Sequence, residues 1–502
     1  MKVQRVLALG FLVALLSTGQ VFAAPAIKQG KDGFTITEGV TDEFMVTMKE
    51  GMSKVTPGKL AFSLSKVSDA DLEKICTAYP DMTALILSDC KEITTFAPLA
   101  NLKKLTYVKI SKVAAKDIAH LANAVDMSTL IIESDFEAPD LQWMSNMAKL
   151  ASLTMNCGKG GKLSSLEGLP AIPGQTSISI TGEGMVLSDL TPLVKSMPNL
   201  KKLDLRYAKV SDLSALAQLA DLRDLSLYGA TVQDFSPLAA CPKLEKVCYY
   251  AAKCDDFSSL GKLTQVNNLE GGLTRLSAID WVENLPNLKS FQLFSEDVSD
   301  YSPLTKTNIE NLTIWSMKKP VGDLSFLSGM GSLKKLKIWS VEDATNFDAL
   351  GNIATLEELD FVGVHEKKGD PVDFSFISKM STLTSLNITG TNGFNFDAIG
   401  SAPAVQKFKL HRINEKSESP VDIGFVGKMP SLASVDLASI KVGNLEGLAA
   451  SPTITHIQLG KDTGITDLSP LKKMAKLDKL GGVKGKFPDD QTQGFPSTVK
   501  IQ

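Results

Sequence analysis

Histidine is scarce in this chain, and charge of neither sign dominates. The four histidines among 502 residues are His120, His365, His411 and His456, and their positions do not have the spacing of metal ligands. The 53 basic and 56 acidic residues give a formal net charge of −3, which provides no global attraction for nucleic acid. We therefore expect a non-enzymatic protein that has no catalytic, cofactor-binding or metal site and that binds no nucleic acid.

Long hydrophobic runs are absent except at the start of the chain. Lys2 and Arg5 accompany an apolar run that continues to Leu16, and the small residue Ala23 follows shortly afterwards. This is the order of a Sec signal peptide, and the run is shorter than the roughly 20 residues that span a bilayer. We therefore expect residues 1–23 to be a cleaved signal peptide, no membrane span, and a mature protein that is periplasmic or secreted.

A short apolar repeat occupies most of the remaining chain. The pattern Leu-x-x-Leu-x-Leu starts at Leu200 and again at Leu222, which is a period of 22 residues. About eighteen such units start at Met82, Leu105, Met127, Leu150, Gln175, Leu200, Leu222, Leu244, Val266, Leu288, Ile309, Leu333, Leu356, Leu383, Val405, Leu432, Ile454 and Leu477. The unit at Val266 is the poorest, because Gly271 stands where its third apolar residue belongs.

The second half of each unit carries a turn and a short helical signal. Asp234-Phe235-Ser236-Pro237-Leu238 is typical, and Ser followed by Pro suits a helix cap and a first helical position. One unit cannot bury its three apolar positions alone, whereas stacked units bury a continuous core. The period predicts an α/β horseshoe, with a parallel sheet on the concave face and short 3₁₀ or α turns on the convex face.

These motifs resemble those of bacterial extracellular leucine-rich repeat proteins, particularly the internalin-like group. The resemblance implies a leucine-rich repeat solenoid that binds other molecules. No wall-anchoring signal follows the repeats, so a surface-anchored role is not expected. The asparagine that often follows the last strand leucine by three residues is also missing, and the residues at that place include Ala208, Ala230, Met317, Val341 and Ile440.

The two ends of the chain depart from the repeat. We expect residues 24–81 to be an N-terminal cap with a degenerate first repeat, residues 82–480 to be the solenoid, and residues 481–502 to be a C-terminal cap or tail. In the cap, Phe34–Ile36 and Phe44–Met48 alternate like short strands. Two charged loops, at residues 364–370 and 413–419, enlarge a duplicated block and are read either as solvated loops or as rim contacts for a partner.

The six cysteines leave two interpretations open. An exported chain has access to an oxidising compartment, and local bridges between Cys248 and Cys254 or between Cys76 and Cys90 are one alternative. Free thiols packed in the core or under loops are the other. Neither alternative suggests a catalytic cysteine.

One column of residues directly after the third core position is rich in aromatic side chains. Neighbours of core positions on a strand face the opposite side of the sheet, so this column lies on the concave surface. It reads Arg206, Tyr228, Tyr250, Gly272, Phe294, Trp315, Trp339, Val362, Thr389 and His411. The rings either stiffen the sheet by stacking or form a binding stripe, because exposed aromatic residues on a concave face mark interfaces.

We predict that the concave face binds another protein. The candidate partner-binding residues are Arg206, Tyr228, Tyr250, Phe294, Trp315, Trp339 and His411. The alternative is a carbohydrate-binding module, because an aromatic stripe also stacks on sugar rings, and a glycan is therefore a second candidate partner. An enzyme is the third class, and the absence of a nucleophile–base pair or metal cluster in the sequence disfavours it.

Overall fold

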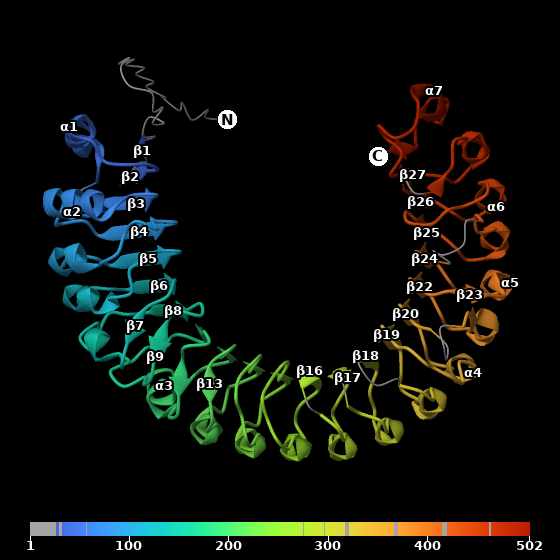
Figure 1. The fold of residues 1–502 in the computed structure, drawn as a ribbon, viewed down its shortest axis with the longest axis horizontal. Coiled ribbons are helices and arrows are strands. Elements are labelled where there is room, and N and C mark those ends of the chain that lie inside the picture. The colour runs from blue at the N-terminus through green and yellow to red at the C-terminus, as the bar shows by residue number, and fades with distance from the viewer. Residues whose placement is uncertain are drawn as a thin grey trace.

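The fold is an open horseshoe whose inner wall is one continuous sheet (Figure 1). The computed structural model describes residues 27–29, 33–56, 58–274, 276–295, 297–316, 321–365, 370–413, 419–460 and 463–502. Within these ranges the sheet has 22 strands, and every pairing in it is parallel except that of β1 with β2. The two ends of the described chain lie on opposite arms of the horseshoe (Figure 1).

The strands of this sheet are β1 (Ile27–Gln29), β2 (Gly33–Ile36), β3 (Ala61–Ser65), β4 (Ala84–Ser88), β5 (Tyr107–Ser111), β6 (Thr129–Glu133), β8 (Ser152–Asn156), β10 (Ser177–Thr181), β12 (Lys202–Asp204), β14 (Asp224–Ser226), β15 (Lys246–Cys248), β16 (Asn268–Thr274), β17 (Ser290–Ser295), β18 (Asn311–Ser316), β19 (Lys335–Trp339), β20 (Glu358–Val362), β22 (Ser385–Thr389), β24 (Lys407–His411), β25 (Ser434–Leu437), β26 (His456–Leu459), β27 (Lys479–Gly481) and β28 (Lys500–Ile501). Each predicted repeat unit contributes one of them.

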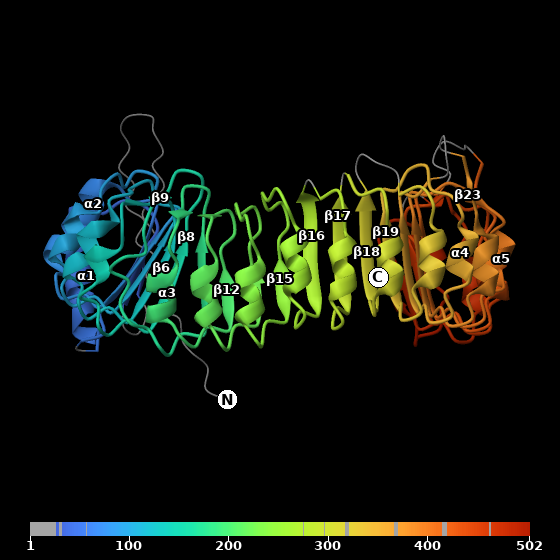
Figure 2. The same ribbon diagram turned by 90° about the horizontal axis from the view of Figure 1, so that it is seen from below.

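The core lies between this sheet and an outer row of short helices (Figures 1 and 2). The register stacks equivalent apolar positions, as where Leu203 pairs with Leu225 and Leu225 with Val247, and all three are fully buried. The 3₁₀ helices are η1 (Met52–Lys54), η2 (Ala97–Asn101), η3 (Ile118–Asn123), η4 (Gln142–Met144), η5 (Ser214–Gln218), η6 (Ser236–Ala240), η7 (Ser258–Lys262), η8 (Asp280–Asn284), η9 (Ser302–Lys306), η10 (Ser325–Gly329), η12 (Phe374–Lys379), η13 (Gly424–Lys428) and η15 (Ser469–Lys473). The α-helices are α1 (Asp42–Gly51), α2 (Asp69–Ala78), α3 (Thr191–Ser196), α4 (Asp348–Gly351), α5 (Phe396–Gly400), α6 (Glu446–Ala449) and α7 (Asp489–Thr492). The chain is a leucine-rich repeat solenoid.

The outer helices are capped differently from the prediction. Ser236 is not the cap of η6 but its first residue, and its backbone N–H donates to Asp234 Oδ1 at 2.8 Å. The same bond joins Ser302 to Asp300 at 2.8 Å and Ser469 to Asp467 at 2.8 Å. The aspartate supplies the acceptor because its carboxylate, two residues upstream of the serine, reaches the first free backbone N–H of the helix. The serine is already inside the helix, so its own side chain does not cap that N–H.

These capping carboxylates predict a specific sensitivity to acid. Hydrogen bonds from Ser236 lower the pKa of Asp234 below its ordinary 3.8, and bonds from Ser302 and Ser469 do the same for Asp300 and Asp467. A carboxyl group with a lowered folded pKa stabilises the fold above its unfolded pKa, and this contribution is lost as pH falls through the folded value. The melting temperature is therefore expected to fall below about pH 4. Replacing the three aspartates with Asn, which keeps an acceptor without titrating, should flatten this fall, and an unchanged slope would contradict the explanation.

One element of the N-terminal cap was predicted wrongly. Phe34–Ile36 lies in strand β2 as expected, but Phe44–Met48 lies in helix α1 and not in a strand. Thr41 caps this helix by accepting from the backbone N–H of Phe44, and Phe44 and Met48, four residues apart, share its buried face. Strand β2 pairs with β3, and β27 pairs with β28, so the sheet continues past residues 82 and 480 at both ends.

Backbone groups replace the missing asparagines in the turns after the strands. Ala208, Ala230, Val341 and Ile440 are buried at that place, and the N–H groups of Ala208 and Ala230 donate to the carbonyls of Leu205 and Leu227. Short parallel ladders then join neighbouring loops. They are formed by β7 (Glu137–Ala138) with β9 (Lys162–Leu163), β11 (Val186–Leu187) with β13 (Lys209–Val210), and β21 (Val372–Asp373) with β23 (Gly393–Phe394). Loop backbones therefore satisfy one another without an asparagine ladder, while Met317 lies outside the described residues.

The poorest repeat unit is completed by the ring of a neighbouring tyrosine. A Cβ atom placed on Gly271 would lie 2.1 Å from Tyr249 Cζ, so this ring occupies the space of the absent third apolar residue. Tyr249 is fully buried, and burial strongly raises its pKa. Among the described residues its hydroxyl has no hydrogen-bond partner.

This hydroxyl leads to a stability prediction. An unpaired buried polar group costs about 1–3 kcal/mol, so Tyr249→Phe should raise the free energy of unfolding by about 1–2 kcal/mol. The urea midpoint measures the change. A fall in the midpoint would mean that the hydroxyl has a partner, such as a buried water, and would refute this prediction.

Several predictions concern residues that the structure does not describe. The signal peptide at residues 1–23 lies outside the described residues, as do 366–369 and 414–418 of the two charged loops. The domain boundaries at residues 23, 81 and 480 stay predictions. Within the described residues no helix is long and apolar enough to cross a membrane.

Candidate binding surface on the concave face

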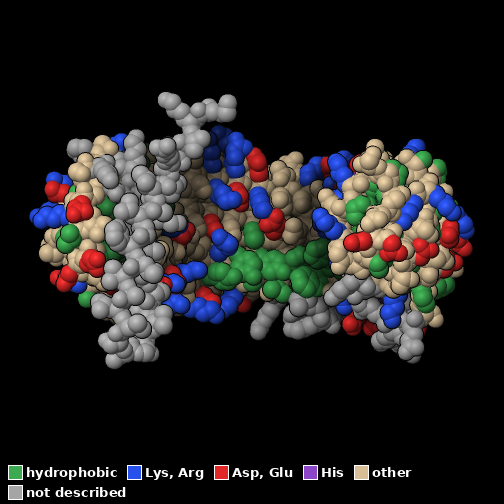
Figure 3. All heavy atoms as spheres, turned by 90° about the horizontal axis from the view of Figure 1, so that it is seen from above, with side chains coloured by type: hydrophobic (Ala, Val, Ile, Leu, Met, Phe, Trp, Pro, Cys, Tyr) green, Lys and Arg blue, Asp and Glu red, His purple; other side chains and the backbone are tan. Residues whose placement is uncertain are grey.

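The strands bring the predicted aromatic column into register on the concave face. Phe294 pairs with Trp315, and Trp315 pairs with Trp339, while Gly272 precedes them on β16. The same register continues through Val362, Thr389 and His411. Figure 3 shows the resulting apolar band along the floor of the concavity, with basic and acidic side chains beside it.

Six rings touch one another in an unbroken series, which we call the aromatic stripe: Tyr207, Tyr228, Tyr250, Phe294, Trp315 and Trp339. The successive ring centroids from Tyr207 to Trp315 lie 5.1, 5.2, 5.2 and 5.2 Å apart, and those of Trp315 and Trp339 lie 6.5 Å apart. The stripe crosses seven strands, from β12 to β19, which at about 4.8 Å per strand makes it about 29 Å long. Such a length is comparable with one side of a protein–protein interface.

The rings are half-buried rather than freely exposed. Tyr207, with 44% relative exposure, is the one exposed ring of the six, because the other five rings cover one another. Tyr228 and Tyr250 are stacked with an angle of 7° between their planes, whereas the other four contacts in the stripe are edge-to-face. Mutual packing therefore holds the rings in fixed positions before any partner arrives.

Gly272 explains why the column lacks one ring without interrupting the stripe. A Cβ atom on this glycine would lie 2.5 Å from Phe294 Cβ and 2.7 Å from Tyr250 Cε2. The absence of a side chain lets Tyr250 and Phe294 meet directly across the rung at 5.2 Å. Gly272 therefore supports the stripe by leaving the space in which Tyr250 and Phe294 touch.

Substituting this glycine should disturb the stripe. Gly272→Ala is expected to lower the free energy of unfolding by about 1–3 kcal/mol, because the added methyl overpacks the two rings. Urea unfolding measures the loss. Gly174→Ala is a matched control, because no atom lies within 4 Å of a Cβ at Gly174 and its φ is not positive. Equal stability of the two variants would show that the ring contact across Gly272 is loose.

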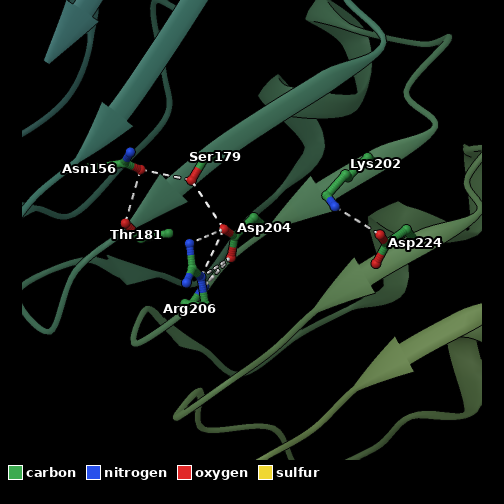
Figure 4. A network of polar contacts seen from close by, with 7 residues as sticks. All are labelled: Asn156, Ser179, Thr181, Lys202, Asp204, Arg206 and Asp224. Atoms are coloured by element: carbon green, nitrogen blue, oxygen red, sulfur yellow. Dashed lines mark hydrogen bonds and ion pairs between the residues drawn. The ribbon is translucent and has the colours of Figure 1, made fainter. Parts of the chain in front are cut away.

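Tyr207 was missed by the sequence analysis, and Arg206 behaves differently from the rest of the column. Arg206 turns back onto its own strand, where Nε donates to Asp204 Oδ1 at 3.0 Å and to Oδ2 at 2.9 Å (Figure 4). Tyr207 has a left-handed backbone, with φ of 63°, which swings its ring onto Tyr228. Strand alternation places Tyr207 off the concave face, so only this unusual backbone conformation brings it there.

A polar network closes the N-terminal end of the stripe. Asn156 Oδ1 accepts from Ser179 Oγ at 2.7 Å and from Thr181 Oγ1 at 3.0 Å (Figure 4). Ser179 Oγ also lies 3.3 Å from Asp204 Oδ2, which links these hydroxyls to the Arg206 ion pair. The apolar surface therefore ends sharply at β10 and β12.

The C-terminal end of the stripe meets Lys337 and Val362. Lys337 Nζ lies 5.8 Å from the centre of the Trp339 ring, and Trp339 Nε1 is buried without a hydrogen-bond partner among the described residues. His411, the last candidate of the column, does not touch the stripe, and its Nε2 lies 2.7 Å from Asp436 Oδ1. The structure thus brings together five of the seven predicted partner-binding residues, whereas Arg206 and His411 flank them, each in contact with an aspartate.

The remaining chemistry-bearing residues form no cluster. In the described part of the chain, no group of three or more His, Cys, Asp or Glu side chains is arranged to hold a metal ion. All six cysteines are unpaired, so neither predicted local bridge forms. Cys90 is buried and contacts the carbonyl oxygen of Leu64, and burial raises the pKa values of Cys76 and Cys157 to about 12. These two thiols stay protonated at neutral pH and are poor nucleophiles.

The comparisons with known proteins concern the fold. No protein-family model matches this sequence, and no curated protein matches it significantly. Among solved structures, an internalin of Listeria monocytogenes is 21% identical, with a TM-score of 0.45 over 68% of this chain and 92% of its own. A leucine-rich repeat protein of Leptospira interrogans is 13% identical, with a TM-score of 0.45 over 86% and 97%. The mouse RP105/MD-1 complex is 14% identical, with a TM-score of 0.45 over 80% and 83%. At these identities the likeness is one of repeat architecture alone.

Proposed function

We propose that this chain is an exported, non-enzymatic protein that binds another protein through its concave face. The observation that carries the proposal is the aromatic stripe, six touching rings in one row on the concave face, with charged side chains beside it. Contiguous apolar patches with a polar rim mark interaction sites on soluble proteins, and Trp and Tyr are enriched among the residues that dominate binding. Export rests on the signal-peptide pattern of residues 1–23 and leads to a periplasmic or secreted location.

The ring geometry favours a protein over a carbohydrate. A sugar stacks on an open ring face, whereas here Tyr228 and Tyr250 cover each other's faces, and the edges of neighbouring rings cover others. The result is a continuous apolar ridge rather than a row of separate platforms. A protein surface with apolar side chains matches such a ridge over its whole length.

Capture with a matched pair of baits tests the proposal. The chain without residues 1–23 and its Trp315→Ala/Trp339→Ala variant are used as baits in an envelope extract, and both are applied to a glycan array. The proposal predicts a protein that the first bait retains and the variant loses, with no glycan that depends on these tryptophans. A glycan that binds the first bait and not the variant would refute it in favour of the carbohydrate-binding alternative.

A further inference from the structure

The charges of the concave face are arranged differently on its two arms. On strands β3 to β22, every lysine and arginine that faces the concavity contacts a carboxylate of the same face. The contacts are Lys109–Glu133 at 2.9 Å, Lys202–Asp224 at 3.0 Å, Arg206–Asp204 at 2.8 Å, Lys246–Glu270 at 2.6 Å, Lys335–Glu358 at 2.8 Å and Lys337–Asp360 at 3.7 Å. This part of the surface is therefore electrically balanced.

The C-terminal arm, from β24 to β28, does not follow this rule. Lys407, Lys409, Lys479 and Lys500 face the concavity there, and none forms an ion pair with a carboxylate within the described ranges. Lys479 and Lys500 are direct neighbours in the parallel register, a like-charge pairing that costs stability. We call these four residues the lysine patch.

The carboxylates near the lysine patch do not balance it. Asp436 is the one concave carboxylate of these strands, and it is engaged by His411 at 2.7 Å. Burial acts to raise the pKa of Asp436, but the hydrogen bond from His411, the backbone N–H of Ala438 and the charge of Lys409 together lower it. Asp478, at the edge of the sheet, lies 3.9 Å from His456. Four lysines thus share their surface with one concave carboxylate, and the patch keeps an excess of positive charge.

We propose that the lysine patch binds an acidic polypeptide segment of the same partner that covers the aromatic stripe. This inference rests on the proposed function and adds the chemistry of the partner. The strands of Trp339 and Lys409, β19 and β24, are three strand spacings apart, or about 14 Å across the sheet. The partner therefore carries aspartate or glutamate side chains about 14 Å beyond the apolar surface that meets Trp339.

An acidic polypeptide fits this surface better than nucleic acid does. The patch contains neither arginine nor a Phe, Tyr or Trp ring on which a base would stack. Complementary carboxylates on a partner would instead relieve the repulsion between Lys479 and Lys500 and steer its approach.

The test uses a fluorescein-labelled peptide of twelve glutamates and the full mature chain, with fluorescence anisotropy as the readout. Binding should exceed that of a twelve-serine peptide and weaken with salt, and Lys407→Glu/Lys409→Glu should weaken it about tenfold, since two exposed charge contacts become repulsions. Lys473→Glu/Lys476→Glu is the matched control, because it makes the same change of charge on exposed residues of the outer side of the same arm. Thermal melting checks that both variants fold.

Three outcomes would overturn the inference: equal binding of the two peptides, equal loss in both charge variants, or preferential binding of a twelve-residue oligothymidine at the patch. Trp315→Ala should leave glutamate-peptide binding unchanged, because the stripe is not part of the lysine patch. Failure of the peptide test therefore refutes only the proposal that the partner carries an acidic segment. The capture experiment with the mature chain and its Trp315→Ala/Trp339→Ala variant tests the stripe independently.

Discussion

Trp315→Ala is expected to weaken binding of the concave-face partner about thirtyfold. Trp315 lies inside the stripe, in contact with Phe294 at 5.2 Å and with Trp339 at 6.5 Å. Truncating a tryptophan at the centre of an interface typically costs at least about 2 kcal/mol, which corresponds to that loss of affinity. Isothermal titration calorimetry with the captured partner measures it directly.

The same substitution should leave the chain folded. Trp315 faces the concavity, so its removal opens no core cavity, but it forfeits two aromatic contacts worth about 0.5–1.5 kcal/mol each. We therefore expect the free energy of unfolding to fall by about 1–3 kcal/mol. Tyr107→Ala is a suitable control, because Tyr107 is a half-buried concave aromatic residue on β5, far from the stripe. Equal affinities of the Trp315 and Tyr107 variants would assign the stripe a purely structural role.

Leu336→Ala is expected to show the opposite behaviour, with a large loss of stability and little loss of affinity. Leu336 is fully buried on β19 and pairs in register with Leu312 and Leu359 of the neighbouring strands. Replacing a core leucine with alanine leaves a cavity and costs about 2–5 kcal/mol. Urea unfolding measures the loss, and titration below the unfolding transition measures the affinity.

This pair of substitutions separates the two faces of the sheet. Leu336 on β19 points into the core, whereas Trp315 on the neighbouring strand β18 lies on the concave surface. If Leu336→Ala weakened binding as strongly as Trp315→Ala at a temperature where both are folded, affinity would depend on the rigidity of the solenoid and not on the rings themselves.

The sequence predicted the parts of this structure that depend on the repeat period. The position of a residue within its apolar motif fixes its neighbours on adjacent strands, so the alignment of Phe294, Trp315 and Trp339 followed from the motifs that start at Leu288, Ile309 and Leu333. The pairing of Lys202 with Asp224 follows from the motifs in the same way and was available to that reasoning.

Features that depend on local backbone geometry were not predictable in this way. Tyr207 joins the stripe through a left-handed backbone conformation that few residues other than glycine and asparagine adopt. The segment Phe44–Met48 fits both the alternating apolar spacing of a strand and the four-residue apolar spacing of a helix. The N-cap at Thr41 favours the helix. The capping role of Asp234 depends on where the helix begins, which the sequence leaves uncertain by one or two residues.

Hydroxyl-radical footprinting of the chain, alone and with its captured partner, tests the central claim most directly. Radicals oxidise exposed aromatic side chains, so a partner seated on the stripe should reduce oxidation of Tyr207, Tyr228, Trp315 and Trp339. Tyr79 and Trp143, partly buried residues outside the stripe, should be oxidised equally in both samples. Protection confined to the stripe is the predicted result. Unchanged oxidation of the stripe, with protection on the outer helices or the rim, would contradict a concave binding face.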